Sequence, residues 1–296
     1  MSKSAKTKNK ENKKAGLNKT AICGLLVSLA GIYIALLVTF PENAGLPPAA
    51  PLTFAAGIGM IAAIVWAADS VRSISKYGLG TGVPSVGMFG IGLSTVIAVF
   101  AAFLNTIWSP IIGAVLALAI GWISGKLINS VIGMNIPGME KRIAEITAGS
   151  TLAMMASFVV VTGTINPMAA GGYIFTGTVT LGFIGIAVAV FHAYNANLGP
   201  DEKPDRTRML TILDASMLLL IYGIMALLFR LGISTSGGAD SGMVGASLQT
   251  LIGPAVIIFM SIAFILIAYY KFWTYVKRDA WKIMETGLLP SEEDLN

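Results

Sequence analysis

The first forty residues, MSKSAKTKNKENKKAGLNKTAICGLLVSLAGIYIALLVTF (1–40), join a lysine-rich tail to an uninterrupted apolar run. Residues 21–40 contain no Asp, Glu, Lys or Arg. A helix needs about 20 apolar residues to cross the hydrocarbon core of a bilayer, whereas the apolar region of a secretory signal peptide has only about 7–15. We therefore predict that residues 21–40 form a membrane span, preceded by a disordered basic tail at residues 1–20.

Seven further apolar runs follow along the chain. They lie at residues 51–68, 85–104, 107–125, 146–164, 173–192, 210–230 and 250–270. Charged residues make up 12% of the chain, about half the usual share of roughly 25%, and the mean hydropathy is +0.77. This composition predicts an all-α, polytopic transmembrane helix bundle of about eight spans over residues 21–271, with no separate soluble domain.

The basic residues predict the orientation of this bundle. If the N-terminus is cytoplasmic, every Lys and Arg except Arg230 falls on the cytoplasmic side, in the tail, in alternate connections or after the last span. Positive charge is retained in the cytoplasm during insertion, so both termini are expected there, in the cell membrane. The net charge of +5 comes mostly from the tail and does not indicate nucleic-acid binding.

The charged stretches between and after the spans are expected to be the cytoplasmic face. We expect loops at residues 69–84, 126–145 and 193–209. Residues 272–296 are expected to form a cytoplasmic amphipathic helix and an acidic tail. The helix would lie on the membrane surface or bind a soluble partner.

Small residues recur every four positions in four of the predicted spans. They are Gly59, Ala63 and Ala67; Gly113, Ala117, Gly121 and Gly125; Gly149, Ala153 and Ser157; and Gly185, Ala189 and Ala193. Such faces allow helices to approach closely in a bilayer, either within the chain or between subunits. Aromatic residues near the span ends, including Trp66, Trp108, Trp122 and Trp273, are expected to form the interfacial belt, in contact with membrane lipids.

Two carboxylates at or near membrane depth are candidate sodium ligands. Asp214 lies about one turn inside the seventh run, beside Thr211 and Ser216, and Glu145 opens the fifth. Ionisable groups in a membrane are costly, and carboxylate and hydroxyl oxygens suit a hard cation. A purely structural role is the alternative for both, because the helix dipole stabilises an acidic residue in the first turns.

The remaining polar residues do not predict covalent catalysis. His192 is the only histidine and Cys23 the only cysteine, which excludes an internal disulfide and a multi-thiolate metal site. We expect His192 to form hydrogen bonds at the inner end of the sixth span. Asp69 is expected to pair with Arg72, three residues further on. No catalytic or cofactor-binding residue is predicted on this chain.

Three polar strings carry a resemblance to a known family. They are YGLGTGVPSVGM (77–88), VIGMNIPGMEKRIAEITAGSTLA (131–153) and HAYNANLGPDEKPDRTRML (192–210). Together they resemble the C subunit of the tetrahydromethanopterin S-methyltransferase complex of methanogenic archaea, and the resemblance covers about residues 20–285.

This resemblance implies a function. Such a complex transfers a methyl group from methyl-tetrahydromethanopterin, or methyl-tetrahydrosarcinapterin, to coenzyme M, and it couples the transfer to sodium export. A corrinoid carried on another subunit is expected to mediate the transfer. The chain would then be a non-catalytic membrane subunit, either in the ion-translocating part or as scaffold, with polytopic sister subunits and the corrinoid-carrying subunit as partners.

A stand-alone secondary transporter is the second function class. Transporters often place broken helices and polar groups near the bilayer midplane. Here the mid-span regions are almost wholly apolar, with Thr95, Thr162 and Thr178 as typical polar residues. This contrast favours the subunit.

Overall fold

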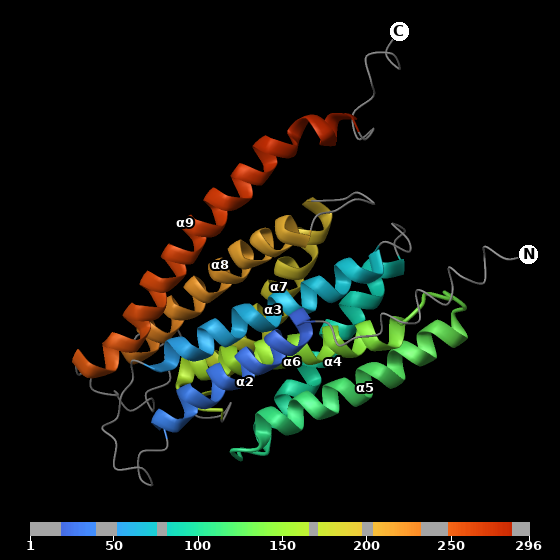
Figure 1. Ribbon diagram of the computed structural model, residues 1–296. Helices are drawn as coiled ribbons and strands as arrows, with labels where there is room; N and C mark the ends of the chain where they lie inside the picture. Colours follow the sequence, from blue (N-terminus) through green and yellow to red (C-terminus); the bar gives the residue numbers. More distant parts are fainter. Residues whose placement is uncertain are drawn as a thin grey trace, which may run out of the picture.

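The computed structural model of the protein describes residues 19–39, 52–75, 82–165, 171–196, 204–231 and 248–285. These ranges contain eight α-helices and no strand (Figure 1). The helices are α2 (Lys19–Thr39), α3 (Thr53–Ser75), α4 (Gly82–Phe103), α5 (Ser109–Val131), α6 (Met139–Thr162), α7 (Gly171–Ala196), α8 (Pro204–Arg230) and α9 (Leu248–Glu285). Each is long and apolar enough to cross a membrane, which confirms the predicted all-α bundle of eight spans.

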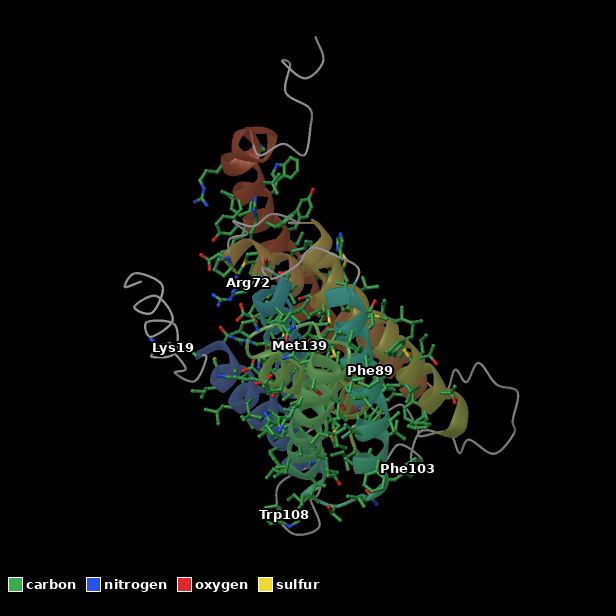
Figure 2. All side chains as sticks on the ribbon, turned by 90° about the vertical axis from the view of Figure 1, so that its right-hand side faces the viewer. Lys19, Arg72, Phe89, Phe103, Trp108 and Met139 are labelled. Carbon is green, nitrogen blue, oxygen red and sulfur yellow. The ribbon has the colours of Figure 1, made fainter. Side chains whose placement is uncertain are left out.

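Successive helices run in opposite directions through the bundle (Figure 1). The starts of α2, α6 and α8 and the last turns of α3 and α5 therefore gather at one end, which we call the charged end. In Figure 2, Lys19 and Arg72 lie toward this end, and Phe103 and Trp108 lie toward the other. The cytoplasmic location of the charged end stays a prediction, and most of the basic tail and all of the acidic tail lie outside the described residues.

Several helices are longer than the apolar runs that predicted them. α3 continues to Ser75, α6 already begins at Met139 and α8 at Pro204, so much of the predicted loops at 69–84, 126–145 and 193–209 is helical. Hydropathy marks only the part of a helix that matches the hydrocarbon core. The backbone beyond that part remains helical, and several of its charged side chains form ion pairs at the charged end.

α6 is the central helix of the bundle, and its apolar stretch is completely buried. It contacts α2, α3, α4, α5, α7 and α8. Gly138 precedes the helix and Gly163 follows it, with φ of 70° and 75°. Glycine adopts this left-handed conformation without a steric penalty, so these two residues fix where α6 begins and ends.

Small residues allow the neighbouring helices to approach α6 closely. A Cβ atom added to Gly149 would lie 2.9 Å from the carbonyl oxygen of Ala63 on α3. One added to Gly125 on α5 would lie 2.7 Å from Cα of Glu140. These small-residue faces on α3, α5 and α6 therefore pack within the chain, which was one of the two predicted uses.

The tryptophan residues that we predicted for the interfacial belt differ in their exposure. Trp108 and Trp122 are exposed on the outside of the bundle, as expected for an interfacial belt. The prediction for Trp66 is wrong, because this side chain is buried. A Cβ atom on Gly24 would lie 3.0 Å from Cγ of Trp66, so the indole fills the space that this glycine leaves between α2 and α3.

α9 runs as a single helix of 38 residues and crosses position 271, where we expected the transmembrane domain to end. It packs along α8 and projects past the start of α8 at the charged end (Figure 1). Residues 272–285 are therefore helical, while their place relative to the membrane surface stays a prediction.

Substituting Gly121 by Ala tests the close packing of α5 on α6. The added Cβ would lie 2.8 Å from Cα of Ala144 and 3.0 Å from the carbonyl oxygen of Ile143. Because these backbone atoms can move aside only at a large energetic cost, we expect a loss of about 1–3 kcal/mol in the free energy of unfolding in mild detergent. Gly92→Ala on α4 is the matched control, because no atom lies within 4 Å of its added Cβ. Equal stability of the two variants would contradict this packing.

Candidate functional site at the charged end of the bundle

A buried carboxylate on α3 joins three helices. Oδ1 of Asp69 accepts hydrogen bonds from Nε and Nη2 of Arg72, at 3.3 and 3.0 Å. Nη2 of Arg208 on α8 lies 3.6 Å from the same oxygen, and it also donates to the hydroxyl of Thr20 on α2 at 3.0 Å. The predicted Asp69–Arg72 pair is confirmed, and α2 and α8 are joined to it.

A second buried carboxylate lies beside the first. Oε2 of Glu145, on α6, accepts a hydrogen bond from the hydroxyl of Ser70 at 2.7 Å and one from Nη1 of Arg142 at 2.8 Å. Ser70 follows Asp69 directly on α3. The last turns of α3 therefore link α6 to α2 and α8 through two adjacent polar residues.

A third carboxylate pairs with the only histidine of the chain. Oδ2 of Asp214, on α8, lies 2.8 Å from Nδ1 of His192 on α7. The Asp214 side chain is only 9% exposed, whereas that of His192 is 53% exposed. A neutral imidazole that donates from Nδ1 presents Nε2 outward as an acceptor.

The hydroxyl groups near Asp214 in sequence are used within their own helix. Thr211 donates to the carbonyl oxygen of Thr207 at 2.7 Å, and Ser216 donates to that of Ile212 at 2.6 Å. The structure thus places His192 against Asp214. Whether Asp214 or Glu145 contacts sodium stays a prediction. In the part of the chain that the structure describes, His, Cys, Asp and Glu do not gather in threes as a metal site would require.

The His192–Asp214 pair and the Arg208–Asp69 contact could not be found from the sequence. Both depend on which helices are neighbours and on how they are rotated. The only sequence signal was their shared position at the polar ends of predicted spans.

The fold and the charged end together define a multi-pass α-helical membrane protein in which buried carboxylates at this end link neighbouring helices. Comparison with known proteins then identifies the family. The family model for the C subunit of tetrahydromethanopterin S-methyltransferase (MtrC) matches residues 1–235.

Curated relatives carry the same description. The protein of Methanosarcina barkeri is 37% identical over 273 residues, which cover 92% of this chain and 91% of the relative. The relative from Methanopyrus kandleri is 34% identical over 80% of each chain. That from Methanococcus maripaludis (strain C5) is 32% identical over 69% of this chain and 77% of the relative. The chain belongs to the family of tetrahydromethanopterin S-methyltransferase C subunits, and the other subunits of that methyltransferase complex are its partners.

Asp69→Asn tests whether the pairs at the charged end hold the helices together. The Asp69 side chain is only 4% exposed, and its loss leaves Arg72 and Arg208, which are 25% and 35% exposed, without their buried carboxylate partner. Because water partly screens both guanidinium groups, we expect the free energy of unfolding to fall by about 1–3 kcal/mol. Asp205→Asn is the matched control: this carboxylate lies 3.6 Å from Nη1 of Arg208 but is 66% exposed, so its loss should cost less than about 1 kcal/mol. The measurement is detergent-solubilised thermal or denaturant unfolding, and a similar small effect for both variants would contradict the role of Asp69.

Proposed function

We propose that this chain is a non-catalytic integral membrane subunit of the complex that transfers a methyl group from methyl-tetrahydromethanopterin, or methyl-tetrahydrosarcinapterin, to coenzyme M. In this proposal the transfer drives sodium export across the cell membrane, and the corrinoid is carried by a partner subunit. Family membership is the observation that carries the proposal. The fold supports the proposal, because its eight described helices are long and apolar enough to form part of the membrane region of such a complex.

The charged end is the part of this chain that we assign to coupling. Asp69, Ser70 and Glu145 link the ends of α2, α3, α6 and α8 through direct hydrogen bonds and ion pairs. A partner subunit that moved one of these helix ends would therefore also move the other helix ends linked to it. Coupling also requires that sodium binds with different affinity in the two states of the carrier, because a ligand shifts an equilibrium only by its differential affinity.

Of the two candidate sodium ligands, Asp214 is the better one. Glu145 already accepts hydrogen bonds from Ser70 and from the guanidinium of Arg142, which compensates its charge. Among the described residues, the hydrogen-bond partner of Asp214 is His192, and an imidazole in its neutral form leaves the carboxylate charge uncompensated. A carboxylate in that state suits a hard cation.

Asp214→Asn tests this assignment. The side-chain amide of this variant would still accept a hydrogen bond from Nδ1 of His192, so the α7–α8 contact is kept while the charge is lost. We expect the sodium stimulation of methyl transfer in membrane vesicles to fall at least tenfold, which corresponds to the loss of about 1.4 kcal/mol of sodium binding. His192→Gln, which keeps the carboxylate, should retain most of the sodium dependence. An unchanged sodium response in Asp214→Asn would exclude Asp214 as a ligand.

Purification of the full chain from its native membrane in mild detergent tests the proposed function itself. We expect companion polypeptides to be retained together with cobalt, measured by mass spectrometry and by elemental analysis. A preparation that contains only copies of this chain, without cobalt, and that moves a solute across a vesicle membrane would contradict the subunit role and favour a secondary transporter.

A further inference from the structure

Two outer helices carry the same aromatic–basic pair at the charged end. On α5, Nζ of Lys126 lies 5.2 Å from the ring centroid of Trp122. On α9, Nζ of Lys277 lies 5.6 Å from the ring centroid of Trp273. In both pairs the lysine follows the tryptophan by four residues, and both indole rings are about half exposed, at 46% and 47%. Figure 1 shows α5 and α9 along opposite edges of the bundle, so the two pairs are separate.

The direction of these helices places each ammonium group on the membrane side of its own Cα atom. Both helices run toward the charged end, and side chains on a helix tilt toward its N-terminus. Each lysine therefore reaches back by one turn, about 6 Å, over a tryptophan nearer the hydrocarbon core. Tryptophan prefers the depth of the lipid headgroups, so we expect the ammonium groups at that depth.

The chemistry of the two Trp–Lys pairs favours an anionic ligand. A cation over an indole face is attracted by the ring, and its N–H groups still point away from that face. In the described part of the chain, no Asp or Glu forms an ion pair with Lys126 or Lys277. At the depth of the headgroups, the anion available to an outward-facing ammonium group is the lipid phosphate.

We propose that Trp122–Lys126 and Trp273–Lys277 are two binding sites for the headgroup of an anionic phospholipid in the leaflet at the charged end. The indole packs against the upper acyl chain, and the ammonium group binds the phosphate. This assignment depends on the multi-pass membrane fold and not on the proposed catalytic partners or on sodium.

Native mass spectrometry of the full-length chain tests both sites. The chain in mild detergent is mixed with phosphatidylglycerol or with phosphatidylcholine, and the bound lipids are counted. We expect preferential retention of phosphatidylglycerol at two sites. Lys126→Gln and Lys277→Gln should each weaken one site about fivefold, and both together should remove the preference. Lys126→Arg and Lys277→Arg should restore binding, because Arg keeps the charge and the contact with the ring.

Three control variants separate these sites from diffuse surface charge. Lys141→Gln and Lys271→Gln remove exposed lysines near the same end, on α6 and α9. Trp108→Ala removes an exposed indole from the opposite end. All three variants should retain the two bound phosphatidylglycerol molecules. Equal losses in these controls, equal retention of phosphatidylcholine, or unchanged lipid binding in the two Lys→Gln variants would overturn the proposal. So would a purified complex that loses companion subunits, but no lipid, when either lysine is replaced by Gln.

Discussion

The complete burial of the apolar stretch of α6 is the constraint on which the rest of the structure depends. In a bilayer the lipid tails are as apolar as leucine, so a helix is held at the centre of a bundle by close van der Waals contact and by interhelical hydrogen bonds. Gly149 and Gly125 supply that contact, because they let the backbones of α3 and α5 approach α6. This close contact of α3 and α5 with α6 determines where these helices, and the charged residues at their ends, lie.

The charged end shows how the same packing brings carboxylates into the protein interior. Asp69 and Glu145 each have an arginine three residues away on their own helix, so much of their charge is compensated locally. The contacts from Ser70, Arg208 and Thr20 then convert these local pairs into links between helices. Burial makes such links costly to break, since the loss of one partner leaves the other charge without compensation. The strings that resemble the family, at residues 131–153 and 192–210, include parts of this end of the bundle.

The number of spans, their order and the Asp69–Arg72 pair could be predicted from the sequence, because each depends on residues that are neighbours along one helix. The ends of α3, α6 and α8 could not, because hydropathy falls where the helices leave the hydrocarbon core although their backbones remain helical. The partners of Asp214 and Arg208 could not be predicted either, since they depend on the contacts between different helices. Trp66 was misplaced for a related reason: its burial depends on Gly24, which lies on another helix.

The alternation of the helices across the membrane, with the charged end in the cytoplasm, is the central claim, and cysteine labelling tests it most directly. Cys23 is exposed, so it is first replaced by Ser. Single cysteines are then introduced at two exposed positions, Thr106, shortly before the start of α5, and Ser130, in its last turn. A membrane-impermeant maleimide should modify Thr106→Cys from outside intact cells and Ser130→Cys only in inverted vesicles. Modification of Ser130→Cys from outside intact cells would contradict the predicted orientation, and modification of both positions from the same side would contradict the alternation itself.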